Sequence, residues 1–200
     1  MAAPTTVATR ASSTEPPPVR KVAAPERAMS VAWLPAATQL GDLDKQQAML
    51  DYFETVFGPY PFENYQVVVH EDRLEIPLEA QGLSIFGVNH LRRNERLIAH
   101  ELAHQWFGNL VTMRWWDDLW LNEGFASWME SRMTARLHPE WNTALNAVRS
   151  RDHAMQRDSV TTTHPVVQHV ETVEQASQAF DSITYSKGQA VITMLEAYVG

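Results

Sequence analysis

The sequence contains no cysteine among its 200 residues. This absence excludes disulfide bonds, thiolate metal ligands and thiol nucleophiles, so His, Asp or Glu would have to bind any metal ion. Basic residues are also few, with 16 Lys and Arg against 24 Asp and Glu and a formal net charge of −8. Proteins that bind nucleic acids usually carry the opposite balance of charge, so we expect no nucleic-acid partner.

Long apolar runs are absent as well. No stretch approaches the ~18 consecutive apolar residues that cross a bilayer, so we expect no membrane span. The composition, 44% hydrophobic and 20% charged, is typical of a folded domain. The sequence as given therefore indicates a soluble protein or a soluble part of one, without distinguishing a cytoplasmic from a secreted location.

Proline and tryptophan are unevenly distributed along the chain. The first 30 residues hold five of the eleven prolines, in a setting rich in Ala, Ser and Thr. This composition is typical of linkers, so we predict that residues 1–40 are disordered or the remnant of a linker, and that residues 41–200 fold. Six of the seven tryptophans lie within 36 residues, and we expect them to pack in the core. They are Trp106, Trp115, Trp116, Trp120, Trp128 and Trp141.

The pattern of apolar residues predicts an α+β fold. Apolar positions at helical spacing from Met49 to Phe57 predict an amphipathic helix that ends at Gly58. Two runs rich in β-branched and aromatic residues, Tyr65–His70 and Leu83–Val88, predict strands that pair in a small sheet. Helical patterns then follow over about 95–107, 119–137, 140–157, 171–180 and 185–199. The sequence therefore predicts a small sheet followed mainly by helices.

The segment His100–His104 reads His-Glu-Leu-Ala-His within the first of these later helices. Residues four apart lie on one face of a helix, about one turn apart, so both imidazoles can approach a single ion. Glu101 lies about 100° around the helix from His100, where it can reach a water molecule beside that ion. A pair of histidines packed in the core is the alternative interpretation.

Glu123 is the candidate for a third metal ligand. It follows His104 by 18 intervening residues and lies near the start of the next predicted helix, which can return antiparallel beside the first. Two His and one Glu leave a fourth position for water, the pattern of catalytic zinc sites. We therefore predict one zinc ion bound by His100, His104 and Glu123.

Glu130 is a candidate to orient one of the liganding imidazoles. It lies seven residues after Glu123 and so returns to the same helix face after two turns. A carboxylate there could accept the second N–H of a liganding His and fix its tautomer. Asp117 and Asp118 compete for this role, and a solvated surface charge is the alternative interpretation of Glu130.

The segments Glu95–Asn109 and Trp120–Ala126 resemble the zinc aminopeptidases related to aminopeptidase N and leukotriene hydrolase, which are gluzincin metallopeptidases. Thermolysin-like endopeptidases share the first motif, but their third ligand lies one residue further along the chain, so the 18-residue gap favours the aminopeptidases. The resemblance implies a thermolysin-like zincin catalytic domain. Residues 41–200 would then be part of that domain, incomplete at both ends.

The resemblance implies two further roles. Phe180–Gly188 is similar to the family segment whose tyrosine hydroxyl hydrogen-bonds the tetrahedral intermediate, and Tyr185 is the matching residue. Pro77–Gly82 stands where the family has Gly-x-Met-Glu-Asn, whose glutamate binds the free α-amino group of the substrate. Only the glutamate, Glu79, is present here. The alternatives are a tyrosine that packs in the core and a solvated loop glutamate.

From these residues we expect a zinc aminopeptidase that removes the N-terminal residue of peptides with a free N-terminus. In this interpretation a zinc-activated water is the nucleophile, Glu101 is the general base, and Tyr185 stabilises the oxyanion. A zinc endopeptidase or an epoxide hydrolase of the same fold is the first alternative. An inactive zinc-binding fragment is the second, because the family's catalytic domain is normally preceded by a β-rich domain and followed by further helices. The sequence makes no prediction of oligomeric state.

Overall fold

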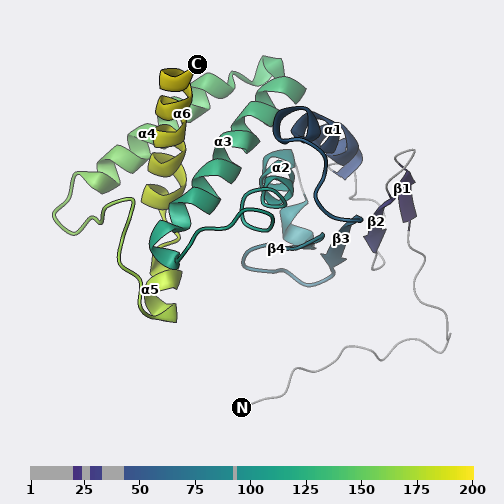
Figure 1. Cartoon of the computed structure of the whole chain (residues 1–200), viewed down its shortest axis with the longest axis horizontal. Helices are drawn as coiled ribbons and strands as arrows, with labels where there is room; N and C mark the ends of the chain where they lie inside the picture. Colours follow the sequence, from purple (N-terminus) through teal and green to yellow (C-terminus); the bar gives the residue numbers. More distant parts are fainter. Residues whose placement is uncertain (1–19, 24–27, 33–42, 92–93) are drawn as a thin grey trace, which may run out of the picture.

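The computed structural model describes residues 20–23, 28–32, 43–91 and 94–200 (Figure 1). A small sheet is followed by helices that dominate the second half of the chain, so the predicted α+β fold is confirmed. The strands are β1 (Arg20–Ala23), β2 (Ala28–Ala32), β3 (Tyr65–His70), β4 (Leu78–Ala80) and β5 (Leu83–Gly87). The α-helices are α1 (Gln46–Phe57), α2 (Glu95–Ala103), α3 (Leu119–Leu137), α4 (Thr143–Asp158), α5 (Val173–Gln178) and α6 (Gly188–Val199). The shorter helical turns are η2 (Val88–His90), η3 (Trp116–Asp118), η4 (Pro139–Trp141) and the π-helical η5 (Ile183–Lys187).

The sheet has the order β1-β2-β3-β5-β4. The two predicted strands, β3 and β5, pair in parallel with Val68 opposite Ile85. Along β3, Tyr65, Val67 and Val69 are buried and alternate with less buried residues, as in a strand with one face on the core. The short β4 pairs antiparallel with β5 at the sheet edge. Sequence patterning does not reveal β4, because three residues directly after Pro77 are too few for a period of two to show.

Two strands lie within the first 40 residues, where the proline-rich composition predicts no secondary structure. β1 and β2 form an antiparallel pair, and β2 continues the sheet in parallel with β3, with Met29 opposite Tyr65. Both strands are free of proline, and Pro25 lies between them. A composition averaged over 40 residues hides two such short runs. The rest of this segment lies outside the described residues, and the division of the chain at residue 40 stays a prediction.

Trp106 packs the segment after α2 against α1 and the connection that follows α1. Its ring meets the rings of Phe53 and Tyr60 edge to face, with centroids 5.9 and 5.5 Å apart, and all three side chains are buried. The expectation that the tryptophans pack in the core is confirmed for Trp106. It is wrong for Trp115, Trp116 and Trp141, which are 56%, 42% and 43% exposed. These three lie in short connections that run over the surface rather than on a buried helix face.

The sheet is followed by as many α-helices as the sequence predicts, but most of them begin or end at other residues than predicted. α3 has the predicted bounds, whereas α2 ends at Ala103 rather than at 107. His104 nevertheless keeps helical dihedrals and donates its N–H to the carbonyl of His100 at 3.2 Å. The spacing of one turn between the two histidines is therefore preserved. Within the described ranges, no helix is both long and apolar enough to cross a membrane.

Candidate metal centre

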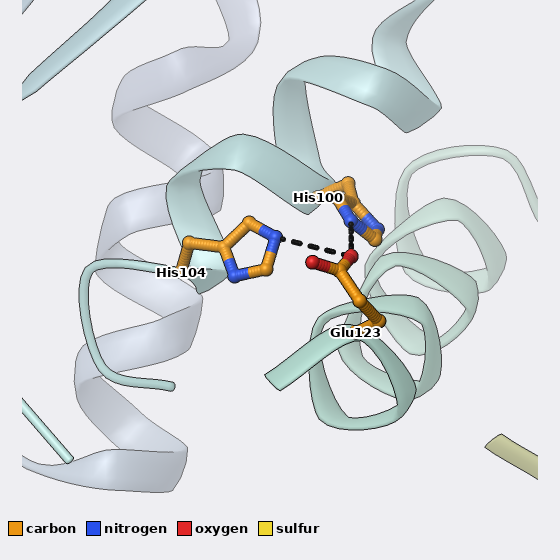
Figure 2. Close-up of side chains that lie close together, drawn as sticks. All are labelled: His100, His104 and Glu123. Carbon is orange, nitrogen blue, oxygen red and sulfur yellow. Dashed lines mark hydrogen bonds and ion pairs between the residues drawn. The ribbon is translucent and has the colours of Figure 1, made fainter. Parts of the chain in front are cut away.

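Three potential metal donors meet between α2 and α3. His100 Nε2 lies 3.2 Å from Glu123 Oε2, and His104 Nε2 lies 3.6 Å from the same oxygen (Figure 2). The donor atoms all lie within 4.8 Å of one another. None of the three residues is more than 7% exposed. The antiparallel return predicted from the 18-residue spacing thus brings Glu123 to the histidine pair.

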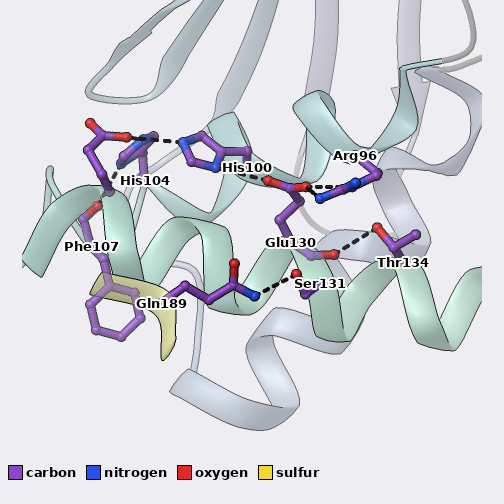
Figure 3. Close-up of polar contacts among 9 residues, drawn as sticks. Arg96, His100, His104, Phe107, Glu130, Ser131, Thr134 and Gln189 are labelled. Carbon is purple, nitrogen blue, oxygen red and sulfur yellow. Dashed lines mark hydrogen bonds and ion pairs between the residues drawn. The ribbon is translucent and has the colours of Figure 1, made fainter. Parts of the chain in front are cut away.

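The outer nitrogens of both imidazoles face hydrogen-bond acceptors. His104 Nδ1 donates to the carbonyl oxygen of Phe107 at 2.9 Å, and His100 Nδ1 lies 3.2 Å from Glu130 Oε2 (Figure 3). An acceptor at Nδ1 keeps the hydrogen on that nitrogen and turns the lone pair of Nε2 toward the other donors. This is the tautomer that a metal ligand needs.

Electrostatics at this place favour a positive charge. Burial lowers the pKa of His100, but hydrogen bonds with Glu123 and Glu130 outweigh burial and raise it to about 10. Burial raises the pKa of Glu123, yet hydrogen bonds with His100 and His104 hold it far below its ordinary value. A buried carboxylate shared by two imidazoles is thus held ionised beside a positive charge. A divalent cation supplies such a charge, and two His with one Glu are a donor set that zinc prefers.

Arg96 supports Glu130 from the opposite side. Its Nε donates to Glu130 Oε1 at 2.6 Å, while the other oxygen of Glu130 faces His100 (Figure 3). Arg96 lies one turn before His100 on α2. The same helix therefore carries His100 and the guanidinium group that holds Glu130 in place. The prediction that Glu130 approaches a liganding imidazole agrees with this contact. Sequence reasoning missed Arg96, although its spacing of four from His100 was the available signal.

Asp117 and Asp118, the competing candidates, lie elsewhere. Asp117 Oδ1 accepts the N–H of Val170 at 2.9 Å, and its Oδ2 lies 3.3 Å from His169 Nδ1. Asp118 is the residue before α3, and its side chain does not cap the helix. Asp117 therefore fastens the segment before α5 to the start of α3 rather than orienting an imidazole.

Glu101 is buried beside the three donors but is not one of them. It is 4% exposed, and no described residue hydrogen-bonds its Oε2. Burial raises the pKa of Glu101 to about 7, against the opposing charges of His100 and His104. A buried carboxylate oxygen without a protein partner is rare in folded proteins, because its lost hydration is not replaced. This oxygen lies beside the three donors with its hydrogen-bonding capacity unused.

Tyr185 reaches the same place from η5. Its ring stacks on the ring of His100, with centroids 5.9 Å apart and planes 25° apart. Burial raises the pKa of the phenol, and the neighbouring carboxylate of Glu123 raises it further. The hydroxyl therefore stays protonated and can donate a hydrogen bond. Tyr185 is thus brought to the donors, as the sequence predicts, but on a π-helical turn rather than in the predicted α-helix.

Two glycines allow η5 and α6 to approach α3 closely. A Cβ added to Gly124, next to Glu123, would lie 3.0 Å from the carbonyl carbon of Gly188. A contact this short is tighter than most contacts that real side chains make, so a Cβ at position 124 would force Gly188 to move by a few tenths of an ångström. Sequence reasoning missed this pair, because a glycine inside a predicted helix gives no sign of its partner.

Glu79 lies on β4, and the residues after His104 hold this strand in place. Asn109 Nδ2 donates to the carbonyl of Glu79 at 3.2 Å. Gln105, which is fully buried, donates to the carbonyl of Ala80 at 3.2 Å and accepts the N–H of Gly82 at 2.8 Å. The charge of Glu79 adds to the effect of burial in raising the pKa of Glu101. The edge strand thus brings a carboxylate near the site, and sequence reasoning missed Gln105 and Asn109 as its support.

The fold and this site define a metallopeptidase site of the zincin class, in which one helix supplies two histidines and a following helix supplies the third ligand. The chain belongs to peptidase family M1, since residues 42–200 match the peptidase family M1 domain. It is 39% identical over 187 residues to "Probable aminopeptidase 2" of Sulfurisphaera tokodaii, covering 85% of this chain and 24% of that protein. It is 38% identical over 183 residues to "Aminopeptidase M1-D" of Oryza sativa, covering 82% and 21%.

Solved structures lead to the same family. A mutant M1 zinc metallopeptidase from Deinococcus radiodurans superposes with a TM-score of 0.68 and 29% sequence identity, covering 87% of this chain and 37% of that chain. The same enzyme with a bound Tyr-Ser-Ala substrate gives a TM-score of 0.69 and 31% identity. These matches confirm the predicted gluzincin family and fold. The chain spans about a quarter of the length of the curated relatives.

Proposed function

We propose that the protein is a zinc aminopeptidase that hydrolyses the first peptide bond of substrates with a free N-terminus. The convergence of His100, His104 and Glu123, with the buried and unpartnered Oε2 of Glu101 beside them, carries the proposal. Family membership and relatives named as aminopeptidases support it. His100, His104 and Glu123 would hold one zinc ion, which supplies a Lewis acid that lowers the pKa of a water molecule and polarises a carbonyl.

Glu101 would act as the general base and then as the general acid. Its free oxygen accepts a proton from the attacking water, and the same carboxyl passes that proton to the leaving amine. Burial raises the pKa of Glu101 above its ordinary value, which makes the carboxylate a stronger base toward the attacking water.

Tyr185 would stabilise the oxyanion that forms at the substrate carbonyl. The raised pKa keeps its phenol protonated, so it donates a hydrogen bond without adding a charge to the ground state. Stacking on His100 fixes the ring beside the reacting centre.

Glu79 would decide that the enzyme cleaves at the N-terminus. A carboxylate on the edge strand can accept a charge-assisted hydrogen bond from a protonated α-amino group, and a substrate with a blocked amine lacks that bond. This contact distinguishes an aminopeptidase from an endopeptidase on the same scaffold.

Substrates with and without a free amine test the proposal. We expect the zinc-loaded protein to hydrolyse an aminoacyl p-nitroanilide and to leave its N-acetylated form uncut. Glu79→Gln should lower kcat/KM for the free-amine substrate about tenfold to a hundredfold, the effect of a lost hydrogen bond to a charged group. Glu75→Gln, at an exposed position just before β4, is the matched control and should leave kcat/KM unchanged.

Each alternative has its own outcome in this experiment. Equal cleavage of the free and blocked substrates would identify an endopeptidase. Hydrolysis of an epoxide without hydrolysis of either anilide would identify an epoxide hydrolase. One zinc ion per chain without any turnover would identify an inactive zinc-binding fragment.

A further inference from the structure

The turn that carries Tyr185 has an uncommon backbone. η5 is a π-helix, in which each turn holds about one residue more than in an α-helix. Such turns are rare and are frequently found at functional sites. An uncommon backbone conformation of this kind persists only where its surroundings support it. The contacts at the two ends of η5 show what supports it here.

Asp181 holds the start of η5 through its side chain and its backbone. Its Oδ1 accepts the N–H groups of Ile183 at 2.8 Å and Thr184 at 3.3 Å, and its carbonyl accepts the N–H of Tyr185 at 3.0 Å. One residue therefore binds three successive amides, including that of the tyrosine itself.

The other carboxylate oxygen of Asp181 is held by two cationic or polar side chains. His164 Nε2 lies 3.1 Å from Asp181 Oδ2, and Arg157 Nε lies 3.5 Å from the same oxygen. The Asp181 side chain is only 18% exposed. These contacts fix the carboxylate in the orientation that binds the η5 amides.

Lys187 holds the end of η5. Its Nζ donates to Asp158 Oδ2 at 2.7 Å, and Asp158 Oδ1 accepts the hydroxyl of Thr163 at 3.2 Å. Arg157 and Asp158 are the last two residues of α4. One helix end therefore contacts both ends of the turn, and Tyr185 lies between the two contacts.

We propose that Asp181 and Lys187 are positioning residues that fasten η5 to the end of α4 and thereby hold the Tyr185 ring against His100. The proposal rests on the proposed function, in which the Tyr185 hydroxyl serves the reaction. Partly exposed ion pairs contribute little to the stability of a whole protein. Their effect here is local, because they act on the backbone and the last residue of one short turn, which also packs against α3.

The test combines hydrogen exchange with kinetics in two backgrounds. Asp181→Ala removes the side-chain contacts at the start of η5, and Lys187→Met removes the contact at its end. Both substitutions are made in the otherwise unchanged chain and in Tyr185→Phe. Asp152→Asn removes an exposed carboxylate from the same helix α4 and is the matched control. Amide exchange over residues 181–187 is measured in all variants, followed by kcat and KM for an aminoacyl p-nitroanilide in the zinc-loaded protein.

We expect exchange over residues 181–187 to become faster in both variants and to stay unchanged in Asp152→Asn. With Tyr185 present, kcat should fall about tenfold to a hundredfold at a nearly constant KM, since a misplacement of about 1 Å costs up to a hundredfold in rate. In the Tyr185→Phe background the same substitutions should lower kcat by less than about twofold, because the hydroxyl that they position is absent.

Unchanged exchange in both variants would overturn the proposal. An equal loss of kcat in the two backgrounds would also overturn it, because the substitutions would then act on the enzyme generally. Faster exchange in a protein that hydrolyses no aminoacyl substrate would leave the contacts to η5 standing and refute the proposed function instead.

Discussion

The metal donors and the two segments that complete the site are held in different ways. The donors lie on two packed helices, and their positions follow from helical spacing and the burial of α2 against α3. Glu79 and Tyr185 lie on a three-residue strand and a π-helical turn, and polar contacts from distant parts of the chain hold both segments. Metal binding should therefore depend on helix packing, whereas catalysis should depend on a few hydrogen bonds. Single substitutions can show whether metal binding and catalysis are lost independently.

Substitution of Glu101 should separate catalysis from metal binding most strongly. Glu101→Gln keeps the shape and burial of the side chain but removes the base, so kcat should fall about a thousandfold while one zinc ion per chain remains bound. Metal analysis and steady-state kinetics check this, with Glu174→Gln on the exposed face of α5 as the control. Turnover at the original rate would remove Glu101 from the mechanism.

Substitution of Glu130 should change metal binding instead. Glu130→Ala removes the acceptor that orients His100, and we expect zinc affinity to fall about tenfold to a hundredfold. Competition with a chromogenic chelator measures this affinity. Arg96→Met, which leaves Glu130 in place but unsupported, should have a smaller effect in the same direction. Unaltered affinity in both variants would show that the contact with Glu130 does not orient the ligand.

Substitution of Gly124 should affect both helix packing and catalysis, because Gly124 lies on α3 where η5 and α6 approach it. In Gly124→Ala the new Cβ would lie 3.0 Å from the Gly188 carbonyl carbon, a tight contact that the start of α6 must relieve by moving a few tenths of an ångström. We expect a loss of about 1–3 kcal/mol in the free energy of unfolding, together with a lower kcat. Denaturant unfolding measures the loss, and Ala135→Ser on the exposed face of α3 is the control. Unchanged stability and kcat would show that the close approach of α3 and α6 is not needed.

The contact between Asn109 and Glu79 should give the smallest effect. Asn109→Ala removes one hydrogen bond to the backbone of β4, so kcat/KM for a free-amine substrate should fall about threefold to tenfold without loss of zinc. Asn146→Ala on α4 is the control. Unchanged kcat/KM in Asn109→Ala would show that this hydrogen bond does not help to position Glu79.

The sequence predicted the parts of the molecule that depend on local periodicity. His100 and His104 share one helix face, and Glu123 lies near the start of the next predicted helix, so the spacing of the two motifs predicted their meeting. The helical pattern also predicted the bounds of α3. The residues that hold η5 and β4 in place could not be predicted in this way. Asp181, Asp158 and Asn109 act through contacts between residues about 30 apart in the sequence or through backbone amides, and such pairings follow from the tertiary fold rather than from any period.

Zinc titration of the metal-free protein tests directly whether His100, His104 and Glu123 form a catalytic zinc site. After treatment with a chelator, we expect one zinc ion per chain to bind and to restore hydrolysis of a free-amine aminoacyl p-nitroanilide. In His104→Ala, zinc at the same concentration should neither bind stoichiometrically nor restore hydrolysis. Hydrolysis that persists in the chelator would show that the reaction needs no zinc. Stoichiometric zinc binding by His104→Ala would show that His104 is not a ligand.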